Sequence, residues 1–84
     1  MYDCLITFRS VMPAQRAEGI LKAQKISCAV RRTPKWMEAQ GCGYCLRLSC
    51  SKLPQAVSLL EENGIQYKKL YRHMGGDRLE EMYL

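Results

Sequence analysis

The sequence contains no long apolar run and no secretion signal. No stretch reaches the roughly 18 consecutive apolar residues of a membrane-spanning helix, so we expect no association with a membrane. Residues 1–6 lack the basic segment and the extended apolar core of a signal peptide, so they are expected to begin the mature protein directly in a strand. We therefore expect a cytoplasmic protein.

Motifs of common enzymes and of nucleic-acid-binding proteins are also missing. The sequence has no hydrolase triad, no phosphate-binding glycine loop and no pair of catalytic carboxylates. Its single histidine, His73, stands alone at the end of a predicted strand, where a solvated or capping role is expected. Residues 44–50 lack the interleaved aromatic side chains on which RNA-binding sheets stack bases. We therefore expect neither a turnover enzyme nor a nucleic-acid-binding protein.

Length and composition indicate one small globular domain. The chain has 84 residues, and 48% of them are hydrophobic, which is typical of folded rather than disordered proteins. A domain of this size buries a modest core, so it needs good packing, a cross-link or a second subunit to be stable. The formal net charge of +5 favours acidic partners without identifying them.

Two kinds of hydrophobic periodicity alternate along the chain. Apolar residues at every second position predict strands over residues 2–9, 26–32 and 44–50. A basic segment predicts a fourth strand over residues 65–72, placed at a sheet edge where lysines prevent aggregation. Helical spacing predicts one helix from Ser10 to about Gln24 and another from Ser51 to the stop at Asn63 and Gly64.

This order of elements predicts an α+β fold, a ferredoxin-like βαββαβ sandwich with a four-stranded antiparallel sheet and two helices on one face. Residues 1–73 form the predicted domain, and residues 74–84 form a short tail that is either helical for a turn or two, disordered, or docked on a neighbouring subunit. We expect a homodimer that forms through an edge strand or through the open sheet face. In a monomer, Leu5 and Ala29 on that face would be exposed to water.

Five cysteines dominate the candidate chemistry, and their odd number means that a complete set of internal disulfides would leave one over. Most of them should be thiols in a reducing cytoplasm. Strand periodicity places Cys4, Cys28 and Cys50 in the core as small hydrophobic residues. Cys42 instead lies in a loop between two glycines, and Cys45 follows at C-x-x-C spacing on the open face of the sheet.

Several segments resemble one protein family. They are Phe8-Arg9-Ser10 after the first strand, Ala23-Gln24-Lys25-Ile26, Arg31-Arg32-Thr33-Pro34, Cys42-Gly43 ahead of Leu46-Arg47, and Leu59-Leu60-Glu61-Glu62-Asn63-Gly64-Ile65. Over about residues 2–72 the chain resembles the selenium/sulfur carrier protein-like family of small bacterial domains. The resemblance implies a carrier whose motif cysteine accepts sulfur or selenium, and only Cys42 matches that cysteine. The chain departs from the pattern by its additional cysteines Cys45 and Cys50, and by Lys25 where a glycine is expected.

The carrier hypothesis assigns a role to each residue around Cys42. Gly41 and Gly43 expose the sulfur. The cations Arg31 and Arg47, with Arg32 and Lys35 nearby, favour the thiolate that attacks a persulfide or selenide donor. Cys45 then releases the product by attacking Cys42. The expected partners are donor and acceptor proteins, and no cofactor is expected.

Other interpretations of the same residues stay open. Gly41 and Gly43 can form a plain turn in which Cys42 is incidental, within a non-catalytic interaction module. A structural zinc site could use the candidate ligands Cys42, Cys45, Cys50 and His73. However, a second C-x-x-C pair is missing, and Cys45 and Cys50 point to opposite faces of the same predicted strand. No metal is therefore expected. A thioredoxin-type motif belongs at a helix start, whereas a strand follows here.

Overall fold

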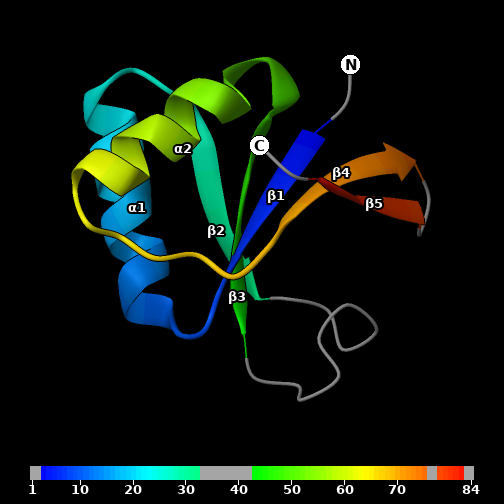
Figure 1. The fold of residues 1–84 in the computed structure, drawn as a ribbon, viewed down its shortest axis with the longest axis horizontal. Coiled ribbons are helices and arrows are strands. Elements are labelled where there is room, and N and C mark those ends of the chain that lie inside the picture. Colours follow the sequence, from blue (N-terminus) through cyan, green and yellow to red (C-terminus); the bar gives the residue numbers. More distant parts are fainter. Residues whose placement is uncertain (1–2, 33–42, 76–77, 83–84) are drawn as a thin grey trace.

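A computed structural model describes residues 3–32, 43–75 and 78–82 as five strands, two α-helices and one short 3-10 helix (Figure 1). In chain order these are β1 (Asp3–Phe8), α1 (Val11–Ala23), β2 (Cys28–Arg32), β3 (Tyr44–Ser49), η1 (Cys50–Lys52), α2 (Leu53–Glu62), β4 (Leu70–Gly75) and β5 (Arg78–Met82). Neither α-helix in the described residues has the length and apolar character required to span a membrane.

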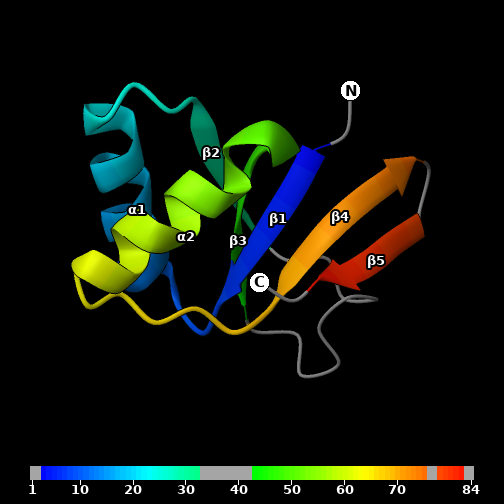
Figure 2. The same cartoon turned by 45° about the horizontal axis from the view of Figure 1, so that its top comes forward.

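The strands form one antiparallel sheet in the order β2-β3-β1-β4-β5. The predicted α+β class with an antiparallel sheet and two helices is confirmed, but the predicted count of four strands is wrong. Residues 78–82, expected to be helical, disordered or docked elsewhere, form β5 beside β4 (Figure 2). Ion pairs between the side chains of Arg72 and Glu80, and of Lys69 and Glu81, help to hold β5 in place.

The fourth strand begins later than predicted and is not at the edge. It runs from Leu70 instead of residue 65, and it lies between β1 and β5. The lysines expected to protect an edge, Lys68 and Lys69, precede the strand. Their backbone groups bond to Thr7 at the end of β1, so they anchor the incoming segment instead.

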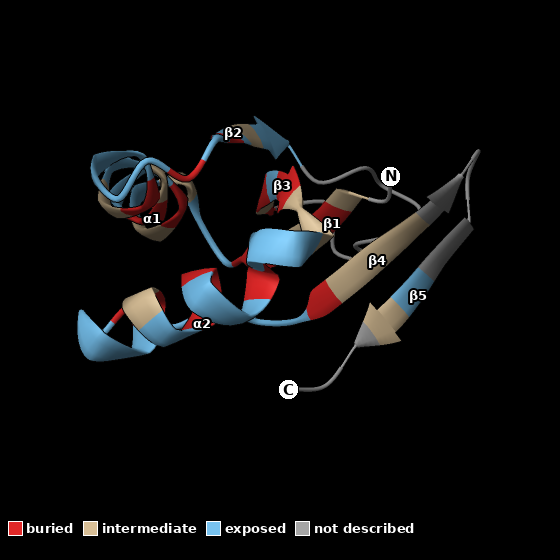
Figure 3. Cartoon of the chain, turned by 90° about the horizontal axis from the view of Figure 1, so that it is seen from above, coloured by how far each residue is buried: buried red, intermediate tan, exposed pale blue. Residues whose placement is uncertain are grey.

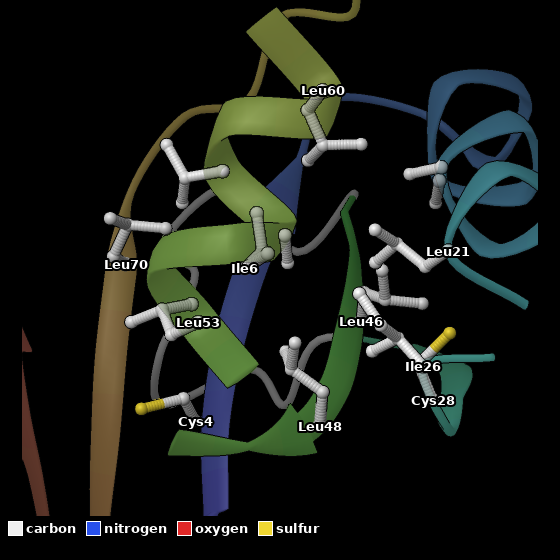
Figure 4. Close-up of a cluster of buried hydrophobic side chains, with 14 of the residues drawn as sticks. Cys4, Ile6, Leu21, Ile26, Cys28, Leu46, Leu48, Leu53, Leu60 and Leu70 are labelled. Atoms are coloured by element: carbon white, nitrogen blue, oxygen red, sulfur yellow. The ribbon is translucent and has the colours of Figure 1, made fainter. Parts of the chain in front are cut away.

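Both helices pack on the same face of the sheet, as predicted (Figure 3). The side chains between the two layers come from β1, β2, β3, the start of β4, both helices and the segments that follow the helices. Figure 4 labels ten of them. Alternation along β1 buries Cys4, Ile6 and Phe8 completely, which confirms the predicted inward face of this strand. The core is small, so each large side chain in it contributes a substantial part of the stability.

Two cysteines beside each other at this core are linked. Cys4 was predicted as core filler and is buried, but its sulfur also forms a disulfide with Cys50. Cys50 was predicted to be a buried residue at the end of the third strand. It lies instead in η1 and is only half-buried, because β3 ends at Ser49 and the chain turns into η1 before α2.

Helix α1 ends at the expected place in an unusual conformation. Gln24 caps the helix, and Lys25 follows with a φ of 64°, the left-handed region that favours glycine. The family resemblance marked this position as one where glycine is expected. Helix α2 is capped by Asn63, and Gly64 follows with a φ of 69°. Both helices are thus followed by a residue with positive φ, which is lysine in one case and glycine in the other.

Substituting Lys25→Gly is therefore expected to raise the free energy of unfolding by about 0.5–1 kcal/mol, because glycine adopts a positive φ without the steric cost of a Cβ. Urea denaturation measures this difference. The matched control is Gly64→Ala, for which the structure offers open space around the added Cβ but leaves the positive φ strained. That variant should lose about 1 kcal/mol. Equal stability of Lys25→Gly and the parent chain would contradict the explanation.

Candidate functional site

The candidate loop enters the sheet at the start of β3. Cys42 and Gly41 lie outside the described residues, whereas Gly43 is described and buried. Tyr44, the first residue of β3, pairs with Phe8 on one side and with Arg32 on the other. The chain therefore passes from Cys42 into the sheet at the end where β1 and β2 finish.

Cys45 occupies a less accessible position than predicted. It pairs with Thr7 of β1 and with Arg31 of β2. It does not belong to the core cluster between the helices and the sheet, which agrees with its predicted place on the sheet face away from the helices. However, the side chain is only 2% exposed. Its neighbour Thr7 is also buried on the same face. A thiol this enclosed has to become uncovered before it can react with a protein partner.

The two predicted supporting arginines lie on exposed parts of the sheet. Arg31 is at the end of β2, directly opposite Cys45 in the register. Arg47 is further along β3, and its Nε donates to an Oδ atom of Asp3 at 2.8 Å, so its charge is balanced by that carboxylate. Arg31 is therefore better placed than Arg47 to influence a charge at the start of β3.

A third arginine named from the sequence, Arg32, lies at this same end of the sheet. The guanidinium carbon of Arg32 lies 6.0 Å from the centre of the Tyr44 ring, at the distance of a cation–π contact. Antiparallel pairing of β2 and β3 brings Arg32, at the end of one strand, to Tyr44, at the start of the other. Arg32 thus adds a positive charge beside the first residue of β3.

The thiol of Cys28 lies in the core. It is buried as predicted, and its Sγ donates to the backbone oxygen of Glu18 at 3.9 Å. Burial raises the pKa of the Cys28 thiol, the Glu18 carboxylate raises it further, and Lys22 partly opposes the rise. Among the cysteines in the described ranges, Cys28 and Cys45 are buried and Cys4 is bonded to Cys50, so none presents an exposed thiolate.

The described residues also bear on the zinc interpretation. Within 3–32, 43–75 and 78–82, no three histidine, cysteine, aspartate or glutamate side chains come close enough to share a metal ion. The sulfur of Cys50 is bonded to Cys4. Along β1, Cys45 is opposite Thr7 and His73 is opposite Asp3, which separates them by about 13 Å along the strand. Cys45 and His73 therefore cannot bind the same ion in this fold.

Comparisons with known proteins give one result. A protein-family model described as Putative Se/S carrier protein-like matches residues 3–72. No curated protein matches the chain, and no solved structure does. The matched residues include the Gly41-Cys42-Gly43 loop, Cys45 and every element from β1 to the start of β4.

Proposed function

Because the chain belongs to the Putative Se/S carrier protein-like family, we propose that it carries a sulfur or selenium atom on the thiol of Cys42. The observation that supports this assignment is the state of the other cysteines. Four of the five lie in the described residues, and each of these is either buried or bonded in a disulfide. Cys42 differs from them in sequence by its two flanking glycines, which favour close approach of a partner's backbone.

Positive charge at the start of β3 supports a reactive thiolate at Cys42. Arg31 and Arg32 end β2 beside this point, and Arg9 directly follows Phe8, the partner of Tyr44. All three arginine side chains are exposed at the protein surface. Nearby cations lower the pKa of a thiol, and the thiolate is the nucleophile in sulfur transfer. Arg47 has a smaller role in this proposal because it pairs with Asp3.

The proposed loading step is an exchange between a thiolate and a persulfide. The Cys42 thiolate attacks the terminal sulfur of the donor persulfide, a new S–S bond forms, and the donor's S–S bond breaks. The donor leaves as a thiolate with the electron pair, and Cys42 becomes a persulfide. The step needs no external oxidant or reductant.

Two unloading routes follow from the position of Cys45. In the first, an acceptor protein's thiolate attacks the terminal sulfur of the Cys42 persulfide and takes it, leaving Cys42 as a thiolate. In the second, the Cys45 thiolate attacks Sγ of Cys42, so that hydrosulfide leaves and a Cys42–Cys45 disulfide remains for a thiol reductant to reopen. The burial of Cys45 favours the first route, since the second needs this side chain to be uncovered.

The proposed partners are therefore donor and acceptor proteins in the cytoplasm, where the carrier thiol stays reduced. We also propose that the chain forms a homodimer through the sheet face opposite the helices. On this face Leu5 is half-buried and Ala29 is exposed. Pairing of two such faces would remove apolar surface from water.

The carrier proposal predicts one sulfur adduct per chain, located on Cys42. The purified protein is incubated with a small-molecule persulfide, the remaining thiols are alkylated, and the adduct is located by intact-mass and peptide mass spectrometry. Cys42→Ser should abolish the adduct, because the nucleophile is lost, whereas the matched control Cys28→Ser should keep it. An adduct that persists in Cys42→Ser would show that another cysteine carries the sulfur.

Cys45→Ser distinguishes the two unloading routes in the same experiment. If Cys45 releases the sulfur, this variant accumulates more adduct than the parent chain and forms no Cys42–Cys45 disulfide. If an acceptor protein takes the sulfur, the variant and the parent chain accumulate the same amount.

A further inference from the structure

A cavity of about 680 Å³ lies between the start of α1 and the segment that follows α2. It is lined by residues 64–69 and by Arg9, Ser10, Pro13 and Arg16. We call it the basic cavity. In Figures 1 and 2 the segment after α2 passes beside the end of β1 on its way to β4. Its volume is within the range of about 300–1,000 Å³ that is usual for sites of small molecules.

The side chains that line the basic cavity carry one sign of charge. Its wall contains Arg9, Arg16, Lys68 and Lys69, and none of the described residues that line it is acidic. The Nζ of Lys69 lies 3.3 Å from a carboxylate oxygen of Glu81, so this charge is partly balanced. In the part of the chain that the structure describes, neither Arg9 nor Arg16 takes part in an ion pair. The two guanidinium groups therefore supply positive charge that a bound anion would balance.

The start of α1 adds to this positive potential. Ser10 is the N-cap residue and lines the cavity, but its hydroxyl makes no capping bond to the helix. The first turn contains no acidic residue. The partial positive charge at the start of this 13-residue helix is therefore not balanced from within the helix.

The wall opposite α1 is held in place by Thr7. Its backbone nitrogen donates to the oxygen of Lys69 at 2.9 Å, and its backbone oxygen accepts from the nitrogen of Lys68 at 2.7 Å. The Thr7 hydroxyl donates to the same Lys69 oxygen and accepts from the Lys69 nitrogen, at 3.2 and 2.9 Å. These bonds join the two lysines to the strand that leads into Arg9, so the cavity is formed before any ligand arrives.

We propose that the basic cavity binds the phosphate group of a small molecule, either inorganic phosphate or a phosphate monoester. Arginine presents planar pairs of N–H donors that match phosphate oxygens, and a helix start offers backbone donors to the same group. The cavity is larger than one phosphate requires, which leaves space for a small organic group. Cys42 is not among the residues that line this site, and Arg9 is the one residue that both proposals use. Phosphate binding does not depend on sulfur carriage.

Titration calorimetry with inorganic phosphate, AMP and adenosine tests the proposal. Phosphate and AMP should bind saturably, and adenosine, which has no phosphate, should not. The double variant Arg9→Gln/Arg16→Gln should weaken binding by about a hundredfold or more, which is about 2.8 kcal/mol, because two charged donors to the phosphate are lost. The control Lys22→Gln removes one charge from the same helix outside the cavity and should bind as the parent chain does.

Comparing the titrations with phosphate and with AMP also identifies the class of ligand. Tighter binding of AMP than of phosphate indicates a phosphate monoester, and equal binding indicates the inorganic anion. The proposal is overturned if the double variant binds like the parent chain, if Lys22→Gln weakens binding equally, or if a polyglutamate peptide binds and neither phosphate does. Cys42→Ser should bind phosphate normally, so failure of the carrier proposal and failure of this one are separate results.

Discussion

Replacing Cys4 and Cys50 together by alanine is expected to lower the free energy of unfolding by about 4 kcal/mol. The disulfide joins residues separated by 46 positions, and it links the central strand β1 to η1 ahead of α2. Cross-linking over so long a loop removes much of the entropy of the unfolded chain. A domain with a total stability of about 5–15 kcal/mol would become marginal without it. Urea denaturation of the oxidised parent chain and the double variant measures the loss.

Reduction of the parent chain provides the control for this prediction. A thiol reductant should destabilise the parent chain and leave the double variant unaffected. Cys28→Ala, which removes a buried cysteine outside the disulfide, should keep its response to the reductant. A parent chain whose denaturation midpoint does not change on reduction would contradict the prediction. Because disulfides are rare in the cytoplasm, the same measurement shows how stable the domain is with Cys4 and Cys50 reduced.

The substitution Phe8→Ala is expected to lower the free energy of unfolding by about 3–5 kcal/mol. Phe8 is 0% exposed and is the largest of the fully buried side chains among the residues that the structure describes. It ends the central strand and pairs with Tyr44, so its removal leaves a cavity where β1 and β3 meet. Thermal or urea unfolding, followed by circular dichroism, provides the measurement.

Met12→Ala is the matched control for Phe8→Ala. Met12 lies in the first turn of α1 and is 68% exposed, so its truncation should change stability by no more than about 0.5 kcal/mol. Equal losses in the two variants would mean that the core is not packed around Phe8 as the structure shows. A loss confined to Phe8→Ala supports the described core.

The sequence predicted those parts of the fold in which one face of an element is buried. Alternation identified β1, β2 and β3, because side chains on alternate sides of these strands meet either the helices or the opposite face. It did not identify β5, whose five residues are Arg78-Leu79-Glu80-Glu81-Met82. Two consecutive glutamates do not suggest a strand, and they become compatible with one only when β4 and its preceding segment supply Arg72 and Lys69.

The candidate site around Cys42 and Cys45 was also predictable only in part. The alternation of side chains along the third strand placed Cys45 on the face away from the helices. The burial of its side chain depends on packing between segments, which a single sequence does not reveal. The basic cavity was missed for a similar reason. Arg9 and Arg16 come from the start of the chain and Lys68 and Lys69 from near its end, and the bonds of Thr7 bring them together. The Cys42 assignment depends on the glycine pattern and the family, and it stays a prediction.

The position of β1 in the sheet has a consequence for biosynthesis. This strand leaves the ribosome before β2, β3, β4 and β5, yet it lies in the middle of the sheet. There Asp3 pairs with Ser49 on one side and with His73 on the other. A nascent chain therefore cannot satisfy the backbone groups of β1 until β4 has emerged. Contacts between residues so distant along the chain form late and slowly. The domain is thus expected to fold only after most of it has been translated, without a stable amino-terminal half as an intermediate.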